Sequence, residues 1–284
     1  MTTWSDLFKP GEATNFFDPP PPQQFHAGST AFDGVNAWWL AELSRLVYRD
    51  NDDRKQFLAR ASLEELDFIN AAHNTQGFLV SPASREWAAL VFRGTSNLED
   101  FLIDGDFRLF QWDRGRVHHG FKLGIDAAWP QVLKDLGALP GSCHLYFAGH
   151  SLGAALATLA ASRKRPAATY TFGSPLVGDQ TFIQTVDAAH TFRVIDHNDL
   201  VTHVPPAIPL VFPYTHVGEE HRLAHTADES VQVLHLLPHL SRPGIDEMQR
   251  TLPGPPDPLA DHAPINYVDR LGATIGFPPR TRRG

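Results

Sequence analysis

The fold is decided by residues 145–161, which read LYFAGHSLGAALATLAA. The first four residues, Leu145 to Ala148, are apolar and predict a buried strand, and the run Ala154 to Ala161 is small and apolar and predicts a helix. Between them, residues 149–153 (GHSLG) fit the G-x-S-x-G pattern, in which a serine sits on a tight turn from strand to helix. Its glycines are needed because side chains on either flank of such a turn would clash. The stretch therefore predicts a nucleophilic serine, Ser151.

The segments around this stretch alternate between the apolar patterns of strands and those of helices. A hairpin is expected, with one strand from Gly77 to Ser81 and the other from Trp87 to Phe92. Further strands are expected at residues 168–172 and 191–195, and helices at 33–49, 121–136, 181–188 and from 264 onward. Ser62 and Glu65 have capping-box spacing, which predicts one more short helix. This alternation predicts an α/β fold with a mostly parallel central sheet covered by helices.

Length and composition narrow the class of protein. The 284 residues suit one large domain, with a Pro-rich arm expected over 1–25 and a single domain over 26–284. The net charge of −8 argues against nucleic-acid binding, and the single cysteine, Cys143, excludes an intramolecular disulfide. No stretch approaches the ~18 consecutive apolar residues of a membrane span, and residues 1–10 contain no apolar run of signal-peptide length. We therefore expect no transmembrane segment, and a protein that is cytoplasmic or exported without a recognisable signal peptide.

A serine hydroxyl needs a base, and the base needs an orienting acid. The segment 194–201 predicts a strand running into a polar loop, which places an acid at the carboxyl end of a strand. Asp196 and Asp199 both qualify by this position, and the residues alone do not separate them.

The base must be chosen from several late histidines. These are His203, His216, His221, His225, His235, His239 and His262. His235 and His239 have a spacing that could suggest a metal pair, but Pro238 between them disfavours the helix that this spacing needs. His262 ends a Pro-rich loop before a predicted helix, which is a good position for a base. We expect no metal and no cofactor.

The developing oxyanion requires hydrogen-bond donors that are already in place. One is expected from the backbone N–H of Leu152, which follows the nucleophile. The second should come from a loop after an earlier strand, and Arg93-Gly94-Thr95 follows the strand that ends at Phe92. Thr95 can donate both its backbone N–H and its hydroxyl.

Several motifs occur in the same order as in a known family. They are residues 91–95 (VFRGT), 117–121 (VHHGF), 149–153 (GHSLG), 171–175 (TFGSP) with Gly178, 197–199 (HND) followed by Val201 and Pro205-Pro206, and Asp261-His262. Over roughly residues 75–270 the sequence resembles the class 3 lipases, the fungal-type triacylglycerol lipases and their plant and bacterial relatives. The resemblance implies an α/β-hydrolase fold, selects Asp199 over Asp196 as the acid, and supports His262 as the base. Tyr267 lies five residues beyond His262, whereas in the fungal members an aromatic follows the histidine within three.

The resemblance also implies a lid. Ser96 and Glu99 have capping-box spacing, and Leu98, Phe101 and Leu102 fall on one face of a short helix after Thr95. In the lipases that this sequence resembles, that position holds the lid. We therefore expect a lipid ester as substrate, met at a lipid–water interface.

The activity expected from these residues is a carboxylic-ester hydrolase with a Ser-His-Asp acyl-enzyme mechanism. Alternatives on the same fold are an esterase for soluble or feruloyl-type esters and a phospholipase A1. A remote alternative is a catalytically silent binding protein. Neither the acyl chain length nor the oligomeric state follows from the sequence.

Overall fold

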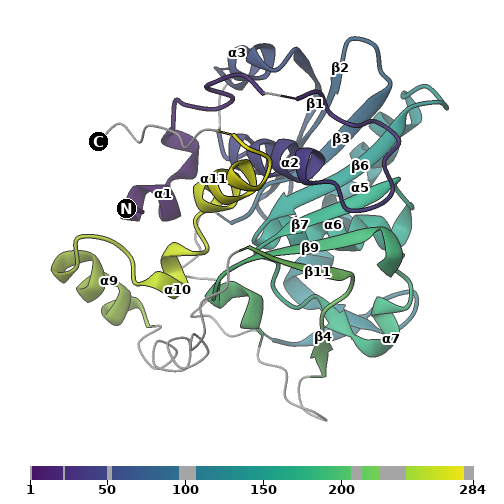
Figure 1. The fold of residues 1–284 in the computed structure, drawn as a ribbon. Helices are drawn as coiled ribbons and strands as arrows, with labels where there is room; N and C mark the ends of the chain where they lie inside the picture. The colour runs from purple at the N-terminus through teal and green to yellow at the C-terminus, as the bar shows by residue number, and fades with distance from the viewer. Residues whose placement is uncertain are drawn as a thin grey trace.

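In a computed structural model, which describes residues 2–21, 23–49, 53–95, 107–205, 213–223 and 241–277, a twisted seven-stranded sheet forms the centre of the protein. Its strand order is β1-β2-β3-β6-β7-β9-β11 (Figure 1). The bounds of these strands are β1 Leu63–Ala71, β2 Thr75–Pro82, β3 Trp87–Phe92, β6 His144–His150, β7 Ala168–Phe172, β9 Thr191–Asp196 and β11 Glu219–Leu223. The expected α/β architecture is confirmed.

The direction of the strands brings several loops to one edge of the sheet. β1, β2 and β3 pair antiparallel, whereas β3, β6, β7, β9 and β11 run parallel. In the register, Gly149 on β6 lies opposite Phe92 on β3, and His150 lies opposite Phe172 on β7. Because carboxyl ends of parallel strands meet at one edge, the loops after β3, β6, β7 and β9 lie close together.

Helices cover both faces of the sheet (Figure 1). On one face α2 (Gly34–Leu46) packs with α11 (Pro264–Thr274), and its core contains Trp38, Tyr146 and Tyr267. On the other face α5 (His119–Gly137) packs beside α6 (Leu152–Arg163) over Leu90 and Phe147. A parallel strand covered on both faces is apolar throughout, as β3 is with all six of its residues buried.

Smaller elements complete the described parts of the chain. A second, four-stranded sheet has the order β10-β8-β5-β4. The remaining bounds are α1 Trp4–Phe8, η1 Pro10–Glu12, α3 Asp53–Arg60, β4 Leu109–Gln111, β5 Arg116–His118, β8 Gly178–Asp179, α7 Gln180–Ile183, η2 Ala188–His190, η3 Leu200–His203, β10 Tyr214–Thr215, α9 Arg242–Thr251 and α10 Asp257–Ala260.

The helix expected at Ser62 and Glu65 is wrong, since Leu63–Ala71 is a strand. Ser62 has a φ of 56°, which is outside the extended geometry of a helix N-cap. β1 pairs with β2 along its length, and Glu65 instead forms a buried ion pair with Arg54 on α3. Tertiary pairing therefore overrides a local pattern that consists of only two residues.

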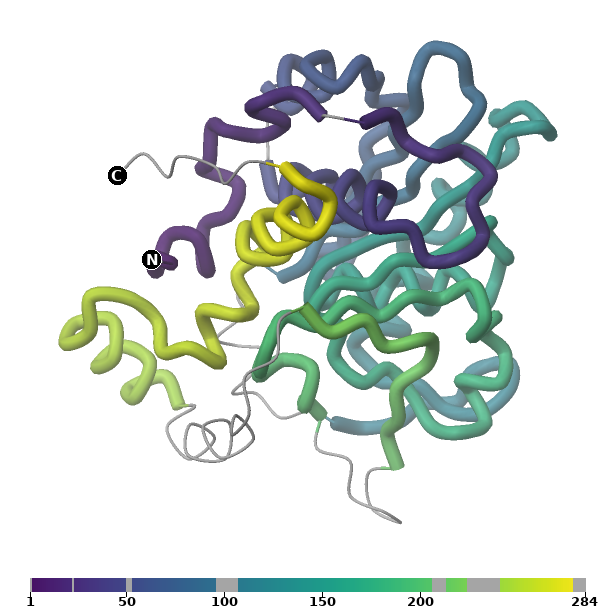
Figure 2. Tube along the Cα trace, in the orientation of Figure 1, coloured from purple at the N-terminus to yellow at the C-terminus, as the bar shows by residue number. Residues whose placement is uncertain are grey.

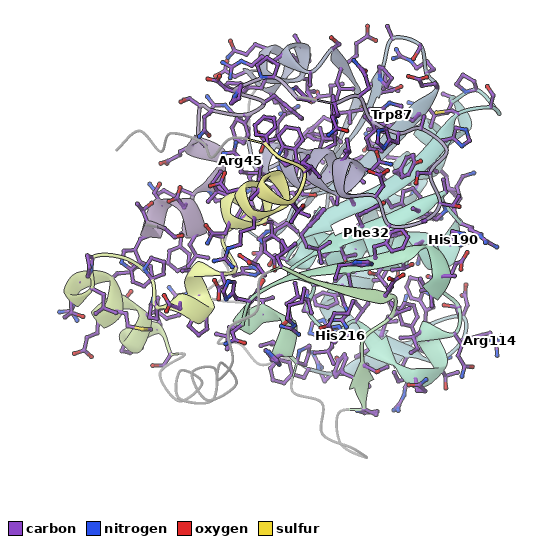
Figure 3. All side chains as sticks on the ribbon, viewed as in Figure 1. Phe32, Arg45, Trp87, Arg114, His190 and His216 are labelled. Carbon is purple, nitrogen blue, oxygen red and sulfur yellow. The ribbon has the colours of Figure 1, made fainter. Side chains whose placement is uncertain are left out.

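The N-terminal segment is anchored in the core. Phe16 and Phe17 are fully buried, and the backbone N–H of Phe17 donates to Glu42 on α2 at 2.6 Å. Arg45, labelled in Figure 3, pairs with the buried Glu42 and donates to Asn15. Figure 2 follows this segment as it runs past α11 and across the sheet. The division into an arm over 1–25 and a domain over 26–284 stays a prediction.

Candidate active site

Ser151 occupies a strained turn between β6 and α6. Its φ and ψ are 60° and −130°, a region that non-glycine residues rarely adopt, and its N–H donates to the Phe172 carbonyl at 2.9 Å. A Cβ on Gly149 would lie 2.3 Å from the Gly153 backbone, and one on Gly153 would lie 2.1 Å from the Phe92 carbonyl oxygen. Both glycines of the motif are therefore required by close backbone contacts, and the turn aims Ser151 away from the strand.

The loop after β3 passes directly beside this turn. A Cβ on Gly94 would meet the Tyr48 hydroxyl at 2.0 Å and the His150 carbonyl oxygen at 2.8 Å. Thr95 follows Gly94 and is partly buried. Leu152 begins α6, so its N–H is one of the first-turn donors without an intrahelical partner. The two residues predicted to hold the oxyanion thus lie on segments that adjoin the Ser151 turn.

Asp199 and His262 form a buried hydrogen-bonded pair. His262 Nδ1 lies 2.9 Å from Asp199 Oδ1 and 2.8 Å from Oδ2, and the two side chains are 0% and 1% exposed. Burial raises the pKa of Asp199, but the neighbouring His262 and the hydrogen bonds from His262 and Tyr267 outweigh it and leave this pKa below its ordinary value. Because a charged carboxylate only accepts, Nδ1 carries a proton, and in the neutral ring the lone pair is then on Nε2.

Tyr267 holds the acid, Asp199, through a hydrogen bond. Its hydroxyl donates to Asp199 Oδ2 at 2.6 Å and accepts the Asp196 N–H at 3.1 Å. Gly173, at the end of β7, permits this arrangement, since a Cβ there would lie 2.4 Å from Asp199 Oδ2 and 3.0 Å from His262 Nδ1. The sequence marked Tyr267 only as an aromatic after the base, and its bond to Asp199 depends on contacts across 68 residues of chain.

His150 connects the nucleophile turn to the loop of the base. Its Nε2 lies 2.7 Å from the His262 carbonyl oxygen and its Nδ1 lies 3.0 Å from the Tyr48 hydroxyl. Since a carbonyl only accepts, Nε2–H donates to it and Nδ1 accepts from Tyr48. Burial and the nearby His262 lower the pKa of His150 to about 3, so the ring is neutral. Neither His150 nor Tyr48 was among the predicted site residues, because a variable position of the motif carries no signal for such a contact.

The structure brings Ser151, Asp199 and His262 to the same edge of the sheet. Ser151 Oγ and His262 Nε2 are both buried, and neither has a hydrogen-bond partner among the described residues. Catalytic hydrogen bonds of this kind are often long without substrate. Asp196, the alternative acid, accepts a hydrogen bond from Arg270. The predicted lid residues Leu98, Phe101 and Leu102 lie outside the described residues, as do His225, His235 and His239.

The comparisons with known proteins bear on this geometry. Residues 89–208 match the family model described as "Lipase (class 3)". The chain is 29% identical over 179 residues to a lipase of Rhizomucor miehei, an alignment that covers 57% of this chain and 48% of the relative. The family model and the fungal relatives support membership of the class 3 lipase family. The motifs after β3, β6, β7 and β9 all lie within the matched residues, whereas His262 and Tyr267 lie beyond them.

Two further relatives extend the match. The secreted mono- and diacylglycerol lipase A of Penicillium cyclopium is 29% identical over 170 residues, which cover 52% of each chain. The crystal structure of a lipase from Rhizopus microsporus var. chinensis shares the fold with a TM-score of 0.57 at 23% identity, over 86% of this chain and 91% of that one. This chain spans about half the length of the curated relatives it matches.

No described helix is long and apolar enough to cross a membrane. Within the same parts of the chain, no group of three or more His, Cys, Asp or Glu side chains is arranged to hold a metal ion.

Proposed function

We propose that this protein is a class 3 lipase that hydrolyses carboxylic esters of lipids through a triad of Ser151, His262 and Asp199. The observation that carries the proposal is the buried Asp199–His262 pair beside a serine on a strained strand-to-helix turn. A serine becomes an effective nucleophile only when such a base, oriented by an acid, can take its proton. The similarity of residues 89–208 to the class 3 lipases supports the same chemistry.

The proposed reaction proceeds in two steps. Ser151 Oγ attacks the ester carbonyl while His262 Nε2 takes its proton, and His262 then gives the proton to the leaving alcohol. Water attacks the acyl-enzyme in the second step, with His262 again acting as base. Asp199 holds the Nδ1 proton and stabilises the imidazolium.

The backbone N–H of Leu152 and the Thr95 donors are proposed to hold the oxyanion. The start of α6 favours negative charge through its unpaired N–H groups. Gly94 allows the loop of Thr95 to approach the Ser151 turn, which supports this assignment. No cofactor enters either step.

The relatives support a glyceride as substrate. The Penicillium relative is a secreted mono- and diacylglycerol lipase. We infer an acylglycerol met at a lipid–water interface, with Leu98, Phe101 and Leu102 in a lid, and export of the chain to that interface. Apolar lid side chains that open in water cost about 25 cal/mol per Å² exposed, and contact with lipid offsets that cost.

A rate panel tests the proposal. Hydrolysis rates are measured for the wild-type protein and for Ser151→Ala on four esters: tributyrin, a phosphatidylcholine, p-nitrophenyl butyrate and methyl ferulate. We expect the fastest turnover on the glyceride and none above background for Ser151→Ala. Preference for the ferulate or the phospholipid would move the assignment to the corresponding alternative, and no turnover of any ester would contradict the proposal.

A further inference from the structure

A buried carboxylate precedes the proposed acid in the chain, and another precedes the proposed base. One arginine, Arg270, binds both carboxylates. Asp196 lies three residues before Asp199 and is fully buried, and Asp261 directly precedes His262 and is 6% exposed. Arg270 on α11 donates from Nη1 to Asp196 Oδ1 and from Nη2 to Asp261 Oδ1, the latter at 3.2 Å. The planar guanidinium is suited to such two-point binding, because its donors have a fixed geometry.

The second oxygen of Asp261 adds a third link. Asp261 Oδ2 accepts the backbone N–H of Asn198 at 3.3 Å, and Asn198 directly precedes Asp199. The loop of the acid is thus joined to the loop of the base by contacts other than the Asp199–His262 hydrogen bond itself. The acid and the base are 63 residues apart in the chain, so noncovalent contacts of this kind must set their separation.

α11 provides both supports of the acid. Tyr267 and Arg270 are three residues apart and therefore lie on one face of the helix. Tyr267 donates a hydrogen bond to Asp199 itself, whereas Arg270 donates to Asp196 and Asp261. α11 packs against β9, which ends at Asp196, and Figure 1 shows α11 beside α2 on one face of the sheet.

The positive charge of Arg270 compensates the burial of Asp196 and Asp261. Burial raises the pKa of Asp196 well above its ordinary value and also raises that of Asp261, and Arg270 is the strongest opposing influence on both. Asp196 Oδ2 is buried with no hydrogen-bond partner in the described parts of the chain. A buried carboxylate that loses its cationic partner is strongly unfavourable, so the loop would rearrange or take up a proton.

We propose that Arg270, with Asp196 and Asp261, forms a clamp that fixes the separation and orientation of Asp199 and His262. The inference rests on the proposed function, since it assigns Asp199 and His262 their roles. Arg270 is a positioning residue in this account, because it acts through two carboxylates that flank the acid and the base. The clamp also gives a role to Asp196, which sequence position alone could not distinguish from the acid.

The test compares Arg270→Met with Arg270→Lys on p-nitrophenyl butyrate, with each preparation normalised by titration of its active sites with a fluorophosphonate. Arg270→Met should lower kcat roughly 10- to 100-fold and leave KM within about twofold, because misplaced catalytic groups affect the chemical step. Arg270→Lys keeps the charge and one contact, and it should recover kcat to within roughly fivefold of the wild type. A variant that loses only thermal stability, with normal kcat per titrated site, would overturn the clamp.

Two further variants keep the result interpretable. Arg85→Met is the matched control, because Arg85 is 30% exposed against 32% for Arg270, pairs with Glu64, and precedes β3 at the opposite end of the strands from Ser151. Its kcat should not change. Asp261→Asn opens mainly the link to Asn198, and it should lower kcat by roughly 3- to 10-fold with the fold intact. Full kcat in Arg270→Met refutes the proposal whatever the kcat of Asp261→Asn.

A spectroscopic readout separates failure of the clamp from failure of the proposed function. The far-downfield proton NMR signal of a histidine Nδ1–H bonded to a carboxylate reports the Asp199–His262 pair without any substrate. This signal should be present in the wild type and in Arg85→Met, and broadened or lost in Arg270→Met. If the wild type hydrolyses no ester, the signal still tests the clamp, and an unchanged signal in Arg270→Met contradicts it.

Discussion

Removal of the Tyr267 hydroxyl is a sharp test of the site, because the structure fixes what is lost. In Tyr267→Phe, Asp199 loses a charge-assisted donor at 2.6 Å and the Asp196 N–H loses its acceptor at 3.1 Å, at a residue that is 1% exposed. A hydrogen bond to a charged group contributes about 1.5–3 kcal/mol, and a buried unpaired donor costs about 1–3 kcal/mol. Because the two losses are not additive, we expect a total of about 2–4 kcal/mol, or roughly 3–7 °C in Tm for a chain of this size.

The same change should affect catalysis less than loss of the acid. Asp199 keeps its bonds to His262 and to the Val201 N–H, so we expect kcat on p-nitrophenyl butyrate to fall roughly tenfold with KM unchanged. Tyr146→Phe is the control: Tyr146 is also fully buried, and its hydroxyl donates at 3.1 Å to the Ser29 carbonyl, which is not part of the site. That variant should lose stability and keep kcat. The reasoning is refuted if Tyr267→Phe has both the wild-type Tm and the wild-type kcat.

Further changes test the remaining assignments. Alanine at any one triad position should lower turnover roughly 10⁴- to 10⁶-fold with an unchanged circular dichroism spectrum, and a wild-type rate at any position removes that residue from the triad. Thr95→Val keeps the backbone donor and loses the hydroxyl, so kcat should fall about 10²- to 10³-fold; if only KM rises, the oxyanion is held elsewhere. Phe101→Asp, in the predicted lid outside the described residues, should flatten the rise in rate above the solubility limit of tributyrin while sparing p-nitrophenyl butyrate; equal kinetics of both proteins would argue against a lid. Burial and the neighbouring Asp67 raise the pKa of Asp135 to about 6, so the folded state binds this proton more tightly than the unfolded state and loses stability as the pH rises through that value. Asp135→Asn should therefore raise Tm at about pH 7.5 and raise it far less at about pH 4, and an equal shift at both pH values would contradict this.

Patterns with a strict local period predicted their elements well. The apolar run before Ser151 and the small-residue run after it are β6 and α6, and the hairpin is β2 and β3. In these segments the apolar pattern, the turn residues and the burial in the fold agree with one another. β11 was missed because its five residues, EEHRL, lack an apolar run and form a strand only by pairing with β9.

The site shows what local patterns leave out. Asp196 and Asp199 are equivalent by position, and they are separated in space by the turn at His197, whose φ is 40°. One carboxylate therefore reaches Arg270 and the other reaches His262. These two contacts span 74 and 63 residues of chain, and the contact between Tyr267 and Asp199 spans 68. No pattern within one segment encodes contacts of this length.

The central claim is that Ser151 is a nucleophile activated by His262. The most direct measurement is intact-protein and peptide mass spectrometry after brief exposure to a fluorophosphonate, with the wild type, Ser151→Ala and His262→Ala compared at equal concentration. We expect one adduct per chain, located on Ser151, absent in Ser151→Ala and formed much more slowly in His262→Ala. An adduct on another residue, or labelling of Ser151 at the wild-type rate in His262→Ala, would contradict it.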